Sequence, residues 1–406
     1  MSSLSWLDYS EHDRRQVLDV IRLFSERDTR DELGIGTIRD AFADILFPGT
    51  STIQTRARYF LLVPWVYREL EGRRIRSADI EAQARRAELA LIGPLTQSAD
   101  PAGTIGSQAG QTLQRLPSSV YWLGLRRWGI RTYDGSQSQY HRSLDAYYRH
   151  GGRGRRNDDG EPVDGRSVGN WHERLPELPS GFPTSVSFSL SVREAEYLRD
   201  RIMLSEPGTL LAFLVDTRQA AEPVPFPWAH PQFGELSPSI REQLLHARNF
   251  AESIHGAALL YNLMLAEQRQ WDAKISEYRL SLQDWAVKLH TRQEAFDTWD
   301  RRRFWEVVAS DGARVPMQTR RFVDAWLSLA SDSTVARAVE ADEHARRLVH
   351  NRERLLKHAQ ARLDNRRALE LWGGAAGRDQ LTYRWPVAQQ LVADIVKGLG
   401  REDGRA

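Results

Sequence analysis

The feature that most constrains the fold of this chain is the stretch 237–290, in which apolar side chains recur every three or four residues. Side chains at that spacing lie on one face of an α-helix, and the stretch is several times longer than a typical β-strand. The same spacing recurs in much of the C-terminal half, over 191–203, 319–330, 335–372 and 387–399. The sequence therefore predicts a mainly α-helical protein.

The expected elements divide the chain into four consecutive segments. Residues 1–92 are expected to form an N-terminal helical region and residues 93–150 a second module. Residues 151–183 are rich in glycine and charge and predict a loop, and residues 184–406 predict a helical C-terminal domain. A chain of 406 residues is long enough for two or three such domains.

The N-terminal region is expected to contain four helices. The first starts near Ser10, and the other three cover 37–47, 52–70 and 77–92. Two further stretches, at the start of the C-terminal domain, have patterns that a strand would also show. Residues 184–191 alternate like a strand, and residues 209–216 fit either a strand or a buried helix.

The module 93–150 has the element order of a winged helix. A helix over 107–116, a Pro-Ser-Ser turn and a second helix capped by Ser118 or Ser119 form a helix-turn-helix. The dipeptide Asp134-Gly135 follows, and it is a strong signal for a β-hairpin that would serve as the wing.

Arginine dominates the charge of this module. Between Thr104 and Arg156 nine arginines face two acids, a charge of +7 in a chain whose total is +2, so the other residues sum to −5. Such asymmetry is typical of a surface that binds nucleic-acid phosphate, although packing or protein docking would also use these residues. The predicted contacts of the module are Arg115, Tyr121, Arg126, Arg127, Arg131 and Arg142.

A second basic stretch, with Arg56 and Arg58, is expected just inside the start of the helix over 52–70. The unpaired N–H groups of a helix N-terminus favour an anion there, so both arginines are candidate nucleic-acid contacts. Because side chains two positions apart do not share a helical face, one of the two is expected to pair inside the protein.

Candidate catalytic groups are few. The absence of cysteine excludes disulfides, thiolate nucleophiles and cysteine zinc sites. His141 and Asp145 share a helical face, with His150 and the acids at 158 and 159 following, and they are the best candidates for a hydrolase that would use Mg²⁺. No cofactor is predicted otherwise.

A polar stripe crosses the apolar stretch 249–271. On a helix Glu252, His255, Asn262 and Arg269 fall within one sector. Buried polar groups must be hydrogen-bonded, so the stripe predicts either a structural network or a pocket in which His255 binds a ligand or acts in catalysis.

Several phrases of the sequence resemble a bacterial domain-of-unknown-function family, the six-three-six-one family. They are DTRDELGIGTIRDAFADILFPGTSTIQTRARYF, PSSVYWLGLRRWGI, HGAALLYNLMLAE and YRWPVAQQLVADIVKGL. The resemblance implies a role in anti-phage defence, beside helicase-like and nuclease-like proteins, but brings no catalytic motif.

The leading hypothesis is a non-catalytic nucleic-acid-binding or scaffolding subunit of a bacterial anti-phage defence complex. The rival is a metal-dependent nuclease or other hydrolase with a site near His141 and Asp145 or near His255. No apolar run approaches the roughly 20 residues of a membrane span, and the first residues lack the apolar core of a signal peptide. We therefore expect a cytoplasmic protein without a membrane partner.

Overall fold

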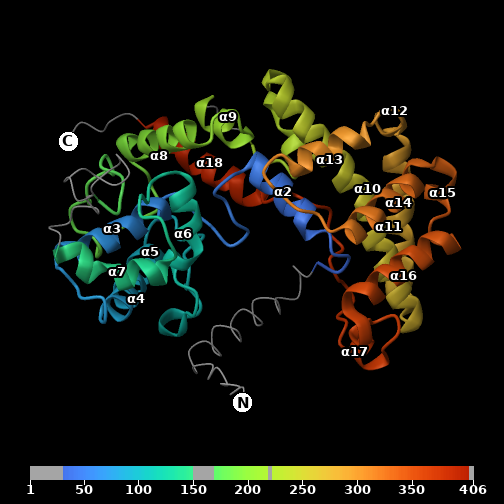
Figure 1. Cartoon of the computed structure of the whole chain (residues 1–406), viewed down its shortest axis with the longest axis horizontal. Helices are drawn as coiled ribbons and strands as arrows, with labels where there is room; N and C mark the ends of the chain where they lie inside the picture. Colours follow the sequence, from blue (N-terminus) through green and yellow to red (C-terminus); the bar gives the residue numbers. More distant parts are fainter. Residues whose placement is uncertain (1–30, 150–168, 218–221, 402–406) are drawn as a thin grey trace, which may run out of the picture. The chain divides into compact units, whose positions relative to one another are not determined.

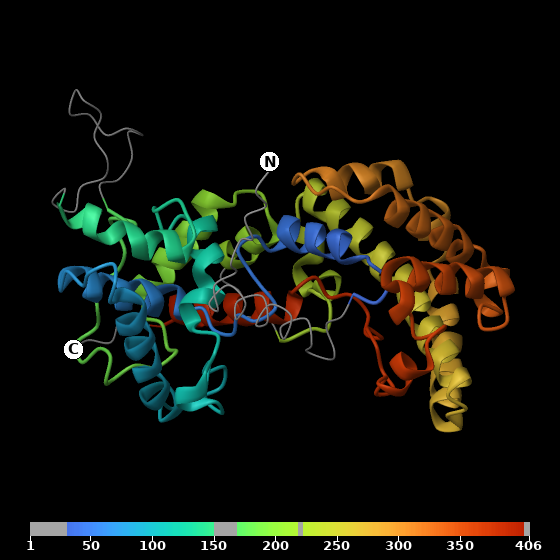
Figure 2. The same ribbon diagram turned by 60° about the horizontal axis from the view of Figure 1, so that its bottom comes forward.

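The computed structural model describes residues 31–149, 169–217 and 222–401. Within these ranges every regular element is a helix, and the only β-pairing is an isolated bridge between Arg131 and Trp171 (Figures 1 and 2). The prediction of a mainly α fold is confirmed. The helix expected near Ser10 and residues 151–168 of the expected loop lie outside the described ranges. Among the described helices, none combines the length and the apolar character needed to cross a membrane.

The chain forms two compact units, each built from separate segments. Among the described residues, unit 1 contains those up to Ala41 together with Leu245–Leu381, and unit 2 contains those within Phe42–Leu244 and from Thr382 onward. The boundaries fall inside α2 (Gly36–Leu46) and α10 (Pro238–Gln268), so each of these helices contributes to both units. This division differs from the four consecutive segments expected, because helical periodicity does not reveal which helices pack together.

Unit 2 is organised around α3 (Tyr59–Gly72), which is buried on nearly every face and contains Pro64 without being ended by it. Helix α3 packs against α4 (Ile80–Ala90) and α6 (Pro117–Arg127), and α18 (Trp385–Leu399) packs against α8 (Val192–Ser205) and α9 (Leu210–Asp216) (Figure 1). Its other described helices are α5 (Ile92–Thr96), α7 (Gln137–Arg149) and the 3-10 turns Gly110–Thr112, Pro227–Ala229 and Pro231–Glu235.

Unit 1 is organised around α10, whose residues from His246 to Ala266 are mostly buried. A Cβ atom at Gly256 would lie 2.3 Å from the ring of Trp285 in α11 (Asp272–His290), so the two helices pack this closely because residue 256 has no side chain. The other described helices of unit 1 are α12 (Gln293–Asp297), α13 (Arg301–Ala309), α14 (Met317–Ser331), α15 (Ser333–Arg337), α16 (Glu343–Lys357), the 3-10 turn His358–Gln360 and α17 (Arg366–Glu370).

Three local predictions require correction or completion. The helix expected over 52–70 begins only at Tyr59, because the phenol oxygen of Tyr121 accepts the N–H of Thr55 at 2.8 Å and holds the preceding residues in a turn. Residues 184–191 bury alternate side chains as a strand would, but no other described segment pairs with them. Residues 209–216 are resolved in favour of the buried helix, α9.

The predicted winged helix is not confirmed. Only the 3-10 turn Gly110–Thr112 occupies the place of the first helix, and the expected hairpin is absent because its second strand is the start of α7. A capping box explains this outcome: Ser136 N–H donates to the side chain of Gln139 at 2.8 Å, and Gln139 N–H donates to the hydroxyl of Ser136 at 3.2 Å. This helix-start signal outweighs the hairpin signal of Asp134-Gly135.

Helix α6 begins at Pro117, and it is capped by a residue of another helix rather than by Ser118 or Ser119. Glu88 of α4 is 1% exposed, and its Oε2 accepts the N–H of Ser118 at 2.7 Å. The other carboxylate oxygen has no hydrogen-bond partner in the described structure. Burial outweighs this hydrogen bond and the nearby Arg85, and it raises the pKa of Glu88 to about 7.

Replacing Glu88 by Gln should remove a pH-dependent part of the stability. Because the pKa rises from 4.5 to about 7 on folding, the folded protein binds the proton more tightly, and its free energy of unfolding falls by about 3 kcal/mol as the pH rises through that interval. Gln mimics the protonated acid. Urea unfolding should therefore find Glu88→Gln close to wild type near pH 5 and more stable than wild type at pH 8.

The exposed Glu81 of the same helix supplies the matched control. Glu81→Gln should leave the pH dependence of stability unchanged. If Glu88→Gln retained the wild-type pH dependence, titration of Glu88 would not be its cause.

Candidate functional site

The solvent-facing side of α6 carries one leucine and two arginines. Leu123 is 81% exposed, and the exposed Arg126 and Arg127 follow three and four positions later, so the three side chains share one face. We call these residues the α6 face. The opposite side holds Tyr121 and Leu125, both fully buried. The helix is therefore anchored by its core side while the α6 face remains accessible.

The two arginines of the α6 face have different partners. Arg126 Nε lies 3.2 Å from the carboxylate of Asp134, which is 85% exposed, and such a surface pair contributes little stability. Arg127 Nε lies 2.6 Å from Glu206, which is 7% exposed. Arg127 neutralises a buried acid, so it is the more strongly held of the two.

Two more predicted contacts lie at the surface of unit 2. Arg115 is partly exposed and precedes α6, and Arg142 is exposed on α7, where its Nε donates to the carbonyl of Ser138 at 3.3 Å. The accessible members of the predicted set are Arg115, Arg126, Arg127 and Arg142.

Arg56 and Arg58 occupy the interior of unit 2, each only 8% exposed. The guanidinium of Arg56 lies 2.9 Å from Asp394, and the same carboxylate accepts the N–H of Ala57 at 2.9 Å. The anion beside this backbone turn is thus the protein's own Asp394. Arg58 pairs with Glu194 at 2.7 Å, so both arginines pair inside the protein, where one was expected to.

Arg131 and Tyr121 are also structural. Arg131 is 2% exposed, lies over the ring of Trp122 at 4.5 Å, and donates to the carbonyls of Trp122 at 3.3 Å and Gly135 at 2.9 Å. Burial lowers its pKa to about 10, so it stays charged at neutral pH. The phenol of Tyr121 donates to the carbonyl of Arg56 at 3.0 Å. Contact of either residue with phosphate would require these bonds to break.

The candidate hydrolytic pair is not a convergent site in the described structure. His141 Nε2 lies 3.1 Å from the hydroxyl of Tyr67, and Asp145 accepts the N–H of Ser77 at 3.0 Å. Burial lowers the pKa of His141. No group of three metal-ligating side chains occurs among the described residues. His150 and the acids at 158 and 159 lie outside them.

The polar stripe of α10 divides into a structural part and an accessible part. Glu252 accepts from Arg292, Asn262 accepts the N–H of Ala376 at 2.8 Å, and Arg269 donates to the carbonyl of Trp372 at 2.6 Å. These three members of the stripe hold neighbouring segments in place. The fourth member, His255, instead lines a pocket.

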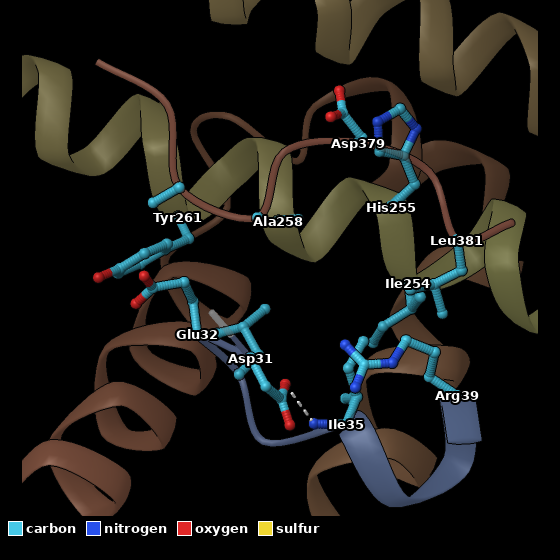
Figure 3. A pocket seen from close by; sticks show the side chains of 13 residues that line it. Asp31, Glu32, Ile35, Arg39, Ile254, His255, Ala258, Tyr261, Asp379 and Leu381 are labelled. Carbon is cyan, nitrogen blue, oxygen red and sulfur yellow. Dashed lines mark hydrogen bonds between the residues drawn. The ribbon is translucent and has the colours of Figure 1, made fainter. Parts of the chain in front are cut away.

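The pocket lies within unit 1 and has a volume of about 120 Å³. Figure 3 shows that its walls come from α10, from the segment before α2 and the start of α2, and from the segment that ends at Leu381. Its lining residues are Asp31, Glu32, Leu33, Ile35, Arg39, Ile254, His255, Ala258, Tyr261, Ala376, Gly377, Asp379 and Leu381.

Sequence reasoning did not identify Asp394, Glu88 or Asp379 as important. Arg56 and Asp394 are separated by 338 positions, and no local pattern connects them. A partial signal existed for Glu88, because it is an acid on the otherwise apolar side of the helical stretch 77–92.

The buried and the exposed arginines should differ in their effect on stability. Arg56→Ala leaves the 4% exposed side chain of Asp394 without its cation, and loss of one partner from such a pair lowers the free energy of unfolding by about 3 kcal/mol. Arg142→Ala removes an exposed side chain and should change it by less than about 0.5 kcal/mol. Urea unfolding of both variants provides the measurement, and equal losses would contradict the structural role of Arg56.

A comparison with known proteins identifies a family that matches nearly the whole chain. The family described as "Family of unknown function (DUF6361)" matches residues 1–398, which confirms the resemblance expected from the sequence. No curated protein and no solved structure matches the chain significantly. The chain belongs to this family of unknown function, DUF6361.

Proposed function

We propose that this protein is a non-catalytic subunit that binds nucleic acid through the α6 face, within a bacterial anti-phage defence complex. The observation that carries the proposal is the exposure of Leu123, Arg126 and Arg127 on one side of a helix whose other side is fixed in the core. Neighbouring guanidinium groups on a fixed helix suit contact with successive phosphates of a backbone.

The charge of the surrounding region supports the same assignment. Residues 56–149 contain 14 arginines and eight acids, a charge of +6, whereas the whole chain carries +2. Three of these arginines, at positions 56, 58 and 131, are buried, so the surface contribution comes from the others. Such a field attracts a polyanion before specific contacts form.

The partner assignment and the defence role rest on the family resemblance. We infer a complex with other defence proteins, such as a helicase or a nuclease, that would supply the catalytic activity. The hypothesis of a hydrolase at His141 and Asp145 has less support, because both side chains have partners inside the protein. A scaffolding role in which Leu123 contacts a protein is the closest competitor.

Nucleic-acid binding should depend on salt, and the α6 face should account for part of that dependence. Each phosphate neutralised contributes about −0.9 to the slope of log affinity against log salt for duplex DNA. The double variant Arg126→Gln/Arg127→Gln should weaken binding and flatten the slope by about 0.9 if only Arg126 contacts phosphate, or by about 1.8 if Arg127 also exchanges Glu206 for phosphate. Fluorescence anisotropy with duplex DNA, single-stranded DNA and RNA provides the measurement. Gln at position 127 retains a donor for Glu206.

The matched control removes two positive charges elsewhere. Arg302 and Arg366 are 90% and 92% exposed on unit 1, so Arg302→Gln/Arg366→Gln should retain the wild-type slope. A wild-type affinity and slope in the α6 variant would overturn the proposed nucleic-acid contact. If Leu123→Asp also abolished co-purification of a protein partner, the scaffolding role would take its place.

The defence role predicts a phenotype in the native host. Deletion of the gene should raise the number of plaques formed by at least some phages, and complementation by the wild-type gene should restore resistance. Complementation by the Arg126→Gln/Arg127→Gln gene should fail, whereas the Arg302→Gln/Arg366→Gln gene should succeed. Equal plaque numbers with and without the gene, over a broad phage panel, would contradict the role.

A further inference from the structure

We propose that the pocket of unit 1 binds a small organic cation, namely an aliphatic amine or guanidinium group. The proposal goes beyond the nucleic-acid contact of the α6 face, because it concerns different residues in a different unit. It rests on three properties of the lining: an imidazole acceptor, an Asp31 carboxylate that accepts hydrogen bonds from backbone N–H groups, and apolar walls.

The acceptor is the Nδ1 atom of His255. Its Nε2 lies 2.9 Å from the carbonyl oxygen of Arg378, and a carbonyl oxygen can only accept, so Nε2 carries the ring proton. Burial also lowers the pKa of His255, which favours the neutral ring. In that tautomer Nδ1 presents a lone pair, and a ligand bound there must donate a hydrogen.

Two acids of the lining add negative charge. The carboxylate of Asp31 accepts hydrogen bonds from the N–H groups of Ile35 at 2.7 Å and Gly36 at 2.5 Å. Because these backbone donors carry no charge, they do not neutralise the carboxylate. Asp379 is 90% exposed and lies 3.8 Å from the Nε of Arg378, which is a loose pair. Figure 3 shows Asp379 beside His255 at one end of the pocket and Asp31 at the other.

The charged lining residues that remain already have ionic partners. Arg39 Nε lies 3.1 Å from the carboxylate of Asp40, and Glu32 pairs with Arg362 at 3.0 Å and with Lys357. The pocket therefore holds its cationic side chains in ion pairs with acids and offers mainly acceptors to a ligand. It favours a cation that carries N–H donors and disfavours an anion.

The walls between the polar ends are apolar. They are formed by Ile35, Ile254, Ala258 and Leu381, and a volume of about 120 Å³ accommodates a short hydrocarbon chain. Because no group of three metal-ligating side chains occurs in the described structure, a divalent cation is a poor fit. An aliphatic chain with a terminal cation matches both the walls and the ends.

The full-length protein tests this assignment by titration calorimetry with agmatine and cadaverine, which are aliphatic cations. Pentanol and glutarate serve as neutral and anionic controls. Cations should bind and both controls should not. An arginine-containing tetrapeptide forms a separate arm: tighter binding of the peptide than of agmatine would assign the site to a partner's side chain, and the reverse order would assign it to a free metabolite.

Two variants connect binding to the pocket. Asp379→Asn and His255→Gln should each weaken agmatine binding by about tenfold, which corresponds to the loss of one good polar contact. Asp379 is exposed, so its variant folds even if the His255 variant does not. Asp284→Asn, an exposed acid of α11 outside the pocket, is the matched control and should bind as wild type.

The result that overturns the proposal is equally specific. Absence of binding by every cation in the millimolar range, or equal binding by wild type and Asp379→Asn, would exclude the site. Neither outcome would affect nucleic-acid binding by the α6 face, so the two proposals fail independently.

Discussion

The arrangement of unit 2 depends on one buried carboxylate, that of Asp394 in the C-terminal helix α18. It lies 2.9 Å from the guanidinium of Arg56 and accepts the N–H of Ala57, which fixes the turn before α3. Tyr121 of α6 binds the backbone of the same turn, so α6 and α18 are both attached to it. Two charges removed from water are stable only when each has such complete hydrogen bonding.

The same residue type serves two physical purposes in this unit. The guanidinium of Arg131 donates hydrogen bonds to backbone carbonyl groups and lies over the Trp122 ring. These contacts stabilise the turn between α6 and α7. Arg126 lies five positions earlier, and its ionic partner in the described structure, Asp134, is an exposed acid. A guanidinium has five donors and retains its charge when buried, so its identity alone does not decide whether it stabilises the fold or binds a partner.

Unit 1 shows a related division on a single helix. In α10, Glu252, Asn262 and Arg269 form hydrogen bonds with neighbouring segments, and His255 lines a pocket while its Nε2 bonds to the carbonyl of Arg378. Buried polar groups that are fully hydrogen-bonded hold the fold in one arrangement. A polar group that still has a hydrogen-bonding position without a partner can form a hydrogen bond with a ligand.

The sequence by itself determined the helical class, the positions of α2 and α4 to within a few residues, and the polar stripe of α10, because these depend on neighbours three or four positions apart. Tertiary structure decided the rest. Helix α6 acquired its cap from Glu88 of another helix, and four of the eight predicted nucleic-acid contacts became buried. Burial and pairing join residues as far apart as Arg56 and Asp394, and no local pattern records which distant side chain will neutralise a charge.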